Sequence, residues 1–168
     1  KTNWQEVKTL VEDHFTVYAM ARRGRGASSA TQGHSVRDEA GDVAAFLDHI
    51  GEPAFLLGHS YGALCALEAT ALAPASVRKL VLYEPPYPDI LSTSVLATLE
   101  ALGAREDWAG LVRTFMLDVL QVPQDEVAEI EASPFWRVWT ADAKASMNDL
   151  QAASTFRFDV AAYEGLGT

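Results

Sequence analysis

The chain has 168 residues, of which 49% are hydrophobic and 21% are charged, values typical of one globular domain. Its 13 lysine and arginine residues are outnumbered by 23 aspartate and glutamate residues, and the formal charge of -10 argues against general binding to nucleic acid or to an anionic membrane surface. A single cysteine, Cys65, excludes an internal disulfide and a metal site built on paired cysteines.

The first 20 residues predict a helix followed by a strand. Trp4, Val7 and Val11 recur at helical spacing, so a helix with one apolar face is expected there. The run FTVYAM that follows is rich in β-branched and aromatic residues, which favours a strand over about residues 15–20.

A loop and a second helix come next. Residues 21–34 are dense in glycine and serine and predict a loop. Ser35, followed by Asp38 three residues later, is the pattern of a capping box, and the apolar stripe after it continues until Gly51. We therefore expect a helix that begins just after Ser35 and ends at Gly51.

Two short apolar runs predict further strands, over about residues 53–58 and 78–83. PAFLLG is continuously apolar, as expected for a central parallel strand that is covered on both faces. Between the two runs, a stretch rich in alanine and leucine predicts a helix that Pro74 stops. Helices that alternate with strands through short connections imply right-handed crossovers, and so an α/β fold with a parallel sheet.

The pattern changes in the second half of the chain. From residue 89 to about 154 no strand pattern occurs, while Trp108 and Leu111 begin a helical stripe. We therefore expect an α/β core over residues 1–88, a helical insertion over 89–154, and a return toward the core over 155–168.

The stretch GHSYG is the main candidate for a functional site. The spacing Gly58-x-Ser60-x-Gly62 arises by accident in about one chain in twenty of this length. Here it lies between a predicted strand and a predicted helix, the context of a nucleophile elbow, in which a strained turn displays the serine hydroxyl above the sheet. The backbone N–H of Tyr61 lies at the start of the helix, where it can stabilise an oxyanion.

Four segments together resemble the α/β-hydrolase fold with a helical cap. They are VYAMARRGRGASS, SVRDEAGDVAAFLDHIG, AFLLGHSYGALCALEA and VRKLVLYEPP. In the family, the first segment is the fourth strand with its RGxGxS loop, the third is the elbow, and the last is the sixth strand leading into the cap. The resemblance explains the basic cluster of Arg22, Arg23 and Arg25 better than a phosphate-binding loop does. The chain departs from the family at Ala21, where aspartate is common.

The resemblance also implies that parts of the fold lie outside this sequence. Family members begin with strands that would precede Lys1, including a third strand that lies between the strands expected at 15–20 and 53–58. They end with strands that carry an acid and a histidine and would follow Thr168. We therefore expect an internal fragment of a larger hydrolase, inactive by itself.

None of the four histidines is a convincing base for Ser60. His59 adjoins the serine, but neighbouring side chains on a strand point to opposite faces, so His59 is expected to pack or hydrogen-bond beneath the elbow. His14 and His49 fall near helix ends, and His34 is expected on the surface. The spacings do not suggest a metal site.

Other candidate residues have two interpretations each. Glu84 follows the third predicted strand on the side where Ser60 emerges. It is either an alternative catalytic acid, as in some family members, or a residue that caps the strand and lines the pocket. Trp136 and Trp139 either line an apolar substrate pocket or pack in the helical core. Cys65 is expected to be a packing residue.

The expected activity of the whole protein is that of a serine hydrolase acting on a carboxylic ester, a lactone or a related acyl compound. The same fold hosts perhydrolases, carbon–carbon bond hydrolases and lyases, and a non-catalytic ligand-binding protein is the alternative from another class. No metal or organic cofactor is implied. Because no apolar run approaches 20 residues and no signal-peptide pattern is present, we expect a cytoplasmic protein that binds a small molecule and neither nucleic acid nor a membrane. The sequence leaves the oligomeric state open.

Overall fold

The computed structural model describes residues 4–29, 33–86 and 90–167. Contacts within the chain divide it into two compact units, Lys1–Thr31 and Gln32–Thr168. The second unit contains both the described sheet and the helical insertion, which we call the cap.

The first unit contains helix α1, Gln5–Val11, where apolar spacing predicts a helix. The strand expected over residues 15–20 is not formed. A strand needs a neighbour to complete its hydrogen-bond ladder, and the ladder found among the described residues joins two other segments. Phe15 and Tyr18 are instead 50% and 58% exposed. Residues 15–20 have a high β propensity but no partner strand among the described residues, so they do not form a strand.

The predicted loop after this segment is closed by local hydrogen bonds. The N–H of Arg25 donates to the carbonyl of Arg22 at 3.1 Å, and the N–H of Gly24 donates to that of Ser29 at 3.0 Å. Ser28 Oγ donates to the carbonyl of Ala21 at 2.7 Å, so the loop is tied to the position at which the chain departs from the family pattern.

Helix α2, Val36–Ile50, begins and ends as its sequence predicts. Ser35 Oγ accepts from the N–H of Asp38 at 3.2 Å, and Asp38 Oδ2 accepts from the N–H of Ser35 at 2.7 Å, which completes the capping box. Gly51 ends the helix in the left-handed conformation, with φ 77°.

Strands β1, Ala54–His59, and β2, Val77–Tyr83, form a parallel pair. Each lies within one residue of its predicted range at both ends. Helix α3, Tyr61–Leu72, and a short 3-10 turn at Pro74–Ser76 connect the two strands. This is the strand–helix–strand unit that the alternating pattern predicts.

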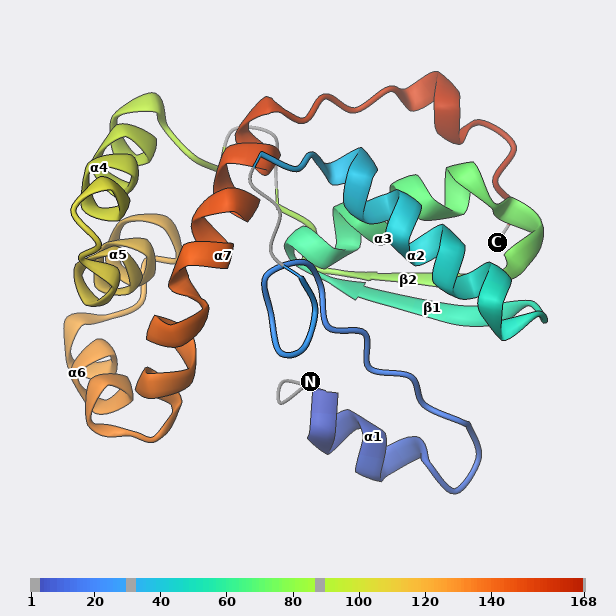
Figure 1. Ribbon diagram of the computed structural model, residues 1–168, viewed down its shortest axis with the longest axis horizontal. Coiled ribbons are helices and arrows are strands. Elements are labelled where there is room, and N and C mark those ends of the chain that lie inside the picture. The colour runs from blue at the N-terminus through green and yellow to red at the C-terminus, as the bar shows by residue number, and fades with distance from the viewer. Residues whose placement is uncertain (1–3, 30–32, 87–89, 168) are drawn as a thin grey trace. The chain divides into compact units, whose positions relative to one another are not determined.

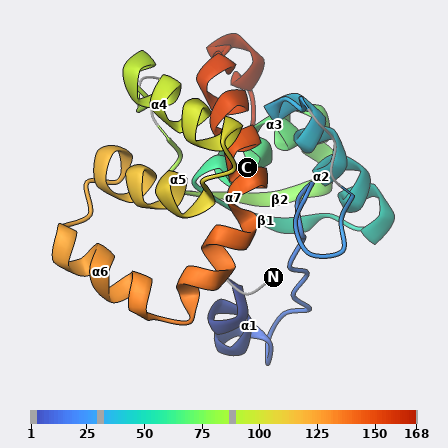
Figure 2. The same cartoon turned by 60° about the vertical axis from the view of Figure 1, so that its left-hand side comes forward.

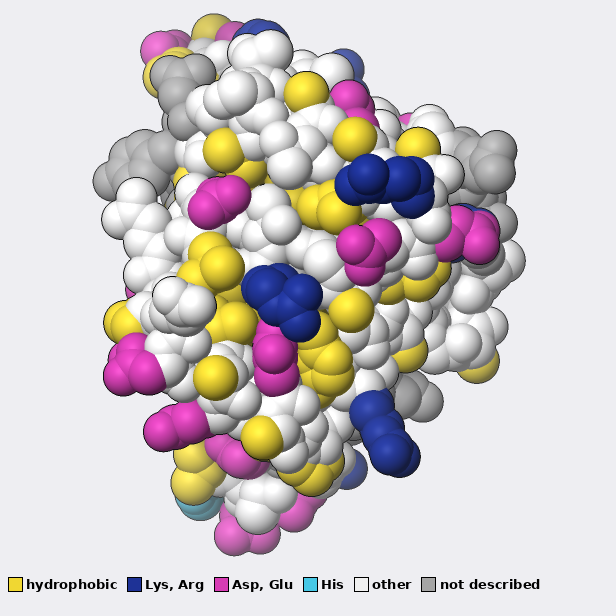
Figure 3. Space-filling model, turned by 90° about the vertical axis from the view of Figure 1, so that its left-hand side faces the viewer, with side chains coloured by type: hydrophobic (Ala, Val, Ile, Leu, Met, Phe, Trp, Pro, Cys, Tyr) yellow, Lys and Arg dark blue, Asp and Glu magenta, His cyan; other side chains and the backbone are white. Residues whose placement is uncertain are grey.

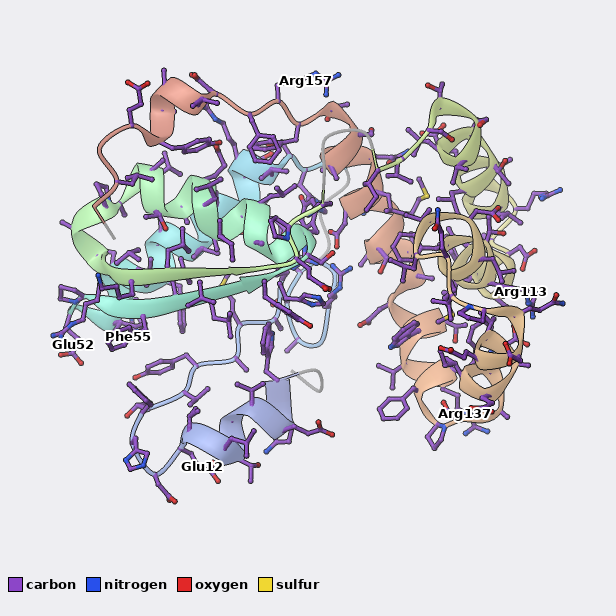
Figure 4. All side chains as sticks on the ribbon, turned by 180° about the vertical axis from the view of Figure 1, so that it is seen from behind. Glu12, Glu52, Phe55, Arg113, Arg137 and Arg157 are labelled. Carbon is purple, nitrogen blue, oxygen red and sulfur yellow. The ribbon has the colours of Figure 1, made fainter. Side chains whose placement is uncertain are left out.

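Helix α3 packs on both strands and α2 packs beside α3, so the two helices cover one face of the sheet (Figure 1). Side chains alternate between the faces of a strand. Phe55 and Leu57 of β1 are 60% and 42% exposed, and Figure 4 shows Phe55 on the side of the sheet away from α3. The expectation that β1 is covered on both faces is therefore wrong for the described residues.

The cap consists of helices joined by short connections. They are α4 (Thr93–Ala104), α5 (Trp108–Thr114) with a π-helical turn at Phe115–Val119, α6 (Gln124–Ala132) and α7 (Phe135–Thr155). Leu99, Leu111, Met116 and Val127 are buried together in the cap's own hydrophobic core. Its outer face, in Figure 3, carries apolar, acidic and basic side chains side by side.

The last helix of the cap leads back to the core (Figures 1 and 2). One hydrophobic cluster joins the end of α7 to α3. It contains Ala152 of α7 and Tyr61 and Leu64 of α3, and Phe156, the residue that follows α7, packs against it. A 3-10 turn at Val160–Tyr163 follows, and the hydroxyl of Tyr163 donates to Glu68 Oε1 on α3. The C-terminal segment is thus attached to the helix that follows Ser60.

Candidate active site

Ser60 joins the end of β1 to the start of α3 in an unusual backbone conformation. Its φ of 52° and ψ of -127° lie in a region that residues other than glycine rarely occupy, at a cost of about 1–3 kcal/mol. Two hydrogen bonds hold this conformation. The N–H of Ser60 donates to the carbonyl of Tyr83 at 3.0 Å, and its carbonyl accepts from the N–H of Ala63 at 2.8 Å.

The side chain of Ser60 is exposed and is not used as a helix cap. Ser60 occupies the N-cap position of α3, yet its side chain makes no capping hydrogen bond, and the residue is exposed. Parallel strands place ligands at their carboxyl ends, where this serine lies. The geometry is therefore that of a strained turn that displays a hydroxyl at the carboxyl edge of the sheet.

The two glycines of the motif differ in what surrounds them. A Cβ on Gly58 would lie 2.5 Å from the carbonyl oxygen of Gly62 and 2.7 Å from the Cα of Ala63, so only glycine allows β1 and α3 to approach this closely. Among the described residues, no atom lies within 4 Å of a Cβ built on Gly62. Close packing therefore explains Gly58 but not Gly62.

Tyr61 opens α3. Its backbone N–H belongs to the first turn of the helix, where amide groups carry the positive end of the helix dipole. This end of a helix favours an anion, including the oxyanion of an acyl intermediate. The side chain of Tyr61 is 7% exposed and packs against Ala152.

Glu84 lies next to the elbow. Tyr83, the last residue of β2, pairs with His59 in the parallel register, so Glu84 follows β2 beside the point where Ser60 follows β1. Glu84 also has a positive φ, 46°, and it is exposed. Strained residues of this kind cluster at functional sites, and two of them stand here at adjacent strand ends.

The four histidines have separate environments. His59 is exposed, and its ring stacks on that of Tyr83, with ring centroids 4.9 Å apart and planes at 28°. His49 lies exposed in the last turn of α2, and His14 lies exposed just after α1.

The surface position expected for His34 is wrong. Its side chain is 1% exposed, and its Nε2 lies 2.9 Å from Glu39 Oε1 and 3.6 Å from Asp149 Oδ1. The three side chains form one buried cluster whose possible metal-ligand atoms lie within 4.8 Å of one another, although their spacing does not suggest a common site. Asp149 comes from the cap, so only the packing of α7 on the core reveals the cluster. We call it the His34 cluster.

The two tryptophans of α7 have different surroundings. Trp136 packs against the hydrophobic core of the cap, and the guanidinium of Arg113 lies 5.9 Å from its ring centroid. Trp139 is 37% exposed, and the nearby Phe135 and Val138 are 67% and 37% exposed. Cap packing therefore accounts for Trp136, whereas Trp139 is partly exposed. Cys65 is buried in α3, as expected of a packing residue.

A small pocket of about 10 Å³ lies where the chain enters and leaves the cap. Leu64, one helical turn after Ser60, contributes to it. The remaining lining residues are Pro86, Ile90, Leu91, Ala153, Ser154, Phe156 and Phe158. No motif marks these residues, because they come from two segments that only the return of α7 brings together.

Comparison with known proteins identifies the family. The model of the alpha/beta hydrolase family matches residues 1–167. An alpha/beta hydrolase from Sphaerobacter thermophilus has a similar structure, with a TM-score of 0.84 and 30% sequence identity, over 98% of this chain and 66% of that one. The chain therefore belongs to the alpha/beta hydrolase family, and its parallel sheet and helical cap are parts of that fold.

Two curated relatives are similar over about half of the chain. N-formylmaleamate deformylase of Pseudomonas putida is 35% identical over 86 residues, which are 49% of this chain and 32% of the relative. The 2-(acetamidomethylene)succinate hydrolase of Mesorhizobium japonicum is 35% identical over 93 residues, 54% of this chain and 33% of the relative. The matched stretch thus spans about a third of each relative. No helix in the described ranges is both long and apolar enough to cross a membrane.

Proposed function

We propose that the whole protein hydrolyses an acyl compound through nucleophilic attack by Ser60. The observation that carries this proposal is the backbone of Ser60, with φ 52° and ψ -127°, held at the junction of β1 and α3 with its side chain not used as a cap. The family assignment supports hydrolysis as the type of reaction. The role of the serine is our inference from the turn.

In this mechanism Ser60 Oγ attacks the carbonyl carbon of the substrate while a base removes the hydroxyl proton. The N–H of Tyr61 stabilises the negative charge that develops on the carbonyl oxygen. The leaving group departs with a proton, and water then releases the acyl group from the serine. His59 stacks on Tyr83, and His34 is buried beside Glu39. His14 and His49 are exposed near helix ends. We therefore assign the base to a part of the protein outside these 168 residues.

The substrate class combines a carbonyl group with a small apolar part. The names of the two curated relatives describe hydrolysis of acylamino compounds, so amides join carboxylic esters and lactones as candidates. The pocket that includes Leu64 and Phe156 has a volume of about 10 Å³, room for about one water molecule, so it would have to widen to hold an acyl group. Glu84 would line the site, or serve as the acid that orients the base.

A fluorophosphonate probe, which labels activated serines, tests the nucleophile. The full-length protein should be labelled, and Ser60→Ala should reduce labelling by at least about a hundredfold, because the substitution removes the proposed nucleophile. Ser94→Ala, which removes an exposed cap hydroxyl, is the control and should leave labelling unchanged. If Ser60→Ala were labelled as strongly as the unsubstituted protein, Ser60 would not be the nucleophile.

A matched pair of substrates then tests the bond that is cleaved. An ester and an amide with the same acyl group differ only in the leaving group, so their kcat/KM values rank the two classes directly. Both rates should depend on Ser60. Turnover that persists in Ser60→Ala would assign the chemistry to another group.

A further inference from the structure

The His34 cluster brings together three groups that can bind a metal ion, each from a different segment. His34 precedes α2, Glu39 lies on α2, and Asp149 lies on α7, the helix that returns from the cap. Their side chains are 1%, 2% and 9% exposed, so bulk water has little access to them. An ion held here would contact the core and the cap at once.

The distances within the cluster match those between neighbouring ligands of one metal ion. Nε2 of His34 lies 2.9 Å from Oε1 of Glu39 and 3.6 Å from Oδ1 of Asp149. Zinc binds histidine nitrogen and carboxylate oxygen at about 2.0–2.2 Å, which places neighbouring ligands in octahedral or tetrahedral coordination about 2.8–3.6 Å apart. The three atoms all lie within 4.8 Å of one another, so small side-chain rotations would place them around one ion.

The charges of the three groups favour a divalent cation. A protonated imidazole would balance one of the two carboxylates, whereas a divalent cation balances both and leaves the imidazole nitrogen to bind it. The carboxylate of Glu39 is also held by a neighbour, because Sγ of Cys65 donates to its other oxygen, Oε2, at 3.9 Å. Hydrogen bonds of this kind orient the carboxylates that bind metals in proteins.

The mixture of nitrogen and oxygen ligands indicates which ions fit. Imidazole suits zinc and other transition metals, whereas magnesium and calcium are bound through oxygen ligands. Zinc is also bound by histidine and carboxylate groups without any cysteine, with a water molecule beside three protein ligands. A transition-metal ion therefore suits the cluster better than an alkaline-earth ion does.

We propose that His34 Nε2, Glu39 Oε1 and Asp149 Oδ1 bind one divalent transition-metal ion, for which Zn²⁺ is the best fit, and that this ion holds α7 on the core. Two ligands belong to the core and the third to the cap helix, so the bound ion links segments that lie far apart in the chain. The ion takes no part in the chemistry of Ser60, and the proposal does not rest on the proposed function.

Calorimetric titration of the full-length protein, first dialysed against a chelator, tests the site with ZnCl₂ as the probe. We expect one tight site per chain, and an excess of CaCl₂ should not displace the zinc. His34→Gln and Asp149→Asn should each weaken Zn²⁺ binding by at least about a hundredfold, because each removes a ligand. The matched controls are His49→Gln and Asp118→Asn, which make the same chemical changes at exposed positions and should keep the affinity.

Hydrogen exchange of the unsubstituted protein locates the ion even if a variant of the cluster fails to fold. Zn²⁺ should slow the exchange of amides in residues 34–40 and 146–152 by at least about tenfold, because both segments carry ligands and the bound ion opposes their opening. Helix α6 is the internal control. It carries exposed acidic residues, Asp125 and Glu126, but none of the three ligands, so its amides should keep their rates.

Several results would overturn the metal site. Absence of Zn²⁺ binding would leave the cluster as a buried ion pair, and displacement of the zinc by CaCl₂ would contradict an imidazole ligand. Equal weakening by the cluster variants and the exposed controls, or protection of α6 in place of the two ligand segments, would assign the ion to the surface. Loss of the Ser60 assignment would leave every one of these results standing, since none requires turnover.

Discussion

Single residues at the elbow combine strain with close approach. Ser60 and Glu84 hold positive φ angles of 52° and 46° at adjacent strand ends, where a hydrogen bond from Ser60 to Tyr83 joins the two turns. Gly58 permits this geometry, because its missing side chain leaves room for the backbone of α3. Backbone hydrogen bonds and the close packing at Gly58 therefore stabilise the strained turn, and the side chain of Ser60 does not.

The packing at Gly58 leads to a stability prediction. Gly58→Ala would place a Cβ 2.5 Å from a backbone oxygen, so the unfolding free energy should fall by about 3 kcal/mol, measured by urea denaturation. Gly41→Ala is the matched control. Gly41 lies inside α2, where no atom of the described residues comes within 4 Å of an added Cβ, and this change should stabilise the protein by about 0.5–1 kcal/mol. A tolerated Gly58→Ala would contradict the close approach.

Among the elements, α2 is the one whose limits depend most clearly on local chemistry. Its capping box satisfies backbone N–H groups at the first turn, and Gly51 ends it with a left-handed conformation. The same helix carries Glu39 and Val36 toward α7 and α3. Its register therefore determines where the His34 cluster forms.

The cap of α2 is directly testable. Ser35→Ala removes the oxygen that accepts from the N–H of Asp38, and the unfolding free energy should fall by about 1 kcal/mol in urea. Ser35→Thr keeps a hydroxyl in the same position and should retain most of the stability. If the threonine variant lost as much as the alanine variant, capping would not be the cause.

For the whole molecule, polar contacts between distant segments attach the cap and the C-terminal segment to the core. Glu68 of α3 accepts from Tyr163, and its other oxygen lies 3.2 Å from Arg37 Nε of α2. Burial, then the hydrogen bond and negative charge of Glu68, raise the pKa of Tyr163 above its ordinary value. The folded protein thus keeps the phenol proton to a higher pH than the unfolded chain does.

This difference predicts the response to alkali. The contribution of Tyr163 to stability is complete below the ordinary tyrosine pKa of about 10 and falls as the pH rises above that value. The unfolding free energies of the natural protein and Tyr163→Phe should therefore differ most at pH 8–9 and converge toward pH 11. Glu68→Gln, which removes the charged acceptor, should weaken the same pH dependence. A constant difference across this range would argue against a raised pKa.

The candidate site was predictable from sequence only where its geometry is local. Ser60, Tyr61 and Gly58 lie within one turn between a strand and a helix, so their spacing and flanking pattern suffice to place them. The surroundings of the site were not predictable in this way. Trp136 and Trp139 share a helix and a residue type, and their different environments depend on which face of α7 meets the other cap helices.

The sequence by itself determined the alternation of helices and strands, the limits of α2, the helical nature of the cap and the turn at Ser60. These features depend on hydrophobic spacing, capping and glycine, which act over a few residues. Only the tertiary structure decided that residues 15–20 form no strand, that one face of β1 is exposed, and that His34 is buried against Asp149. A strand requires a paired neighbour and burial requires a covering element, and both come from segments far away in the chain.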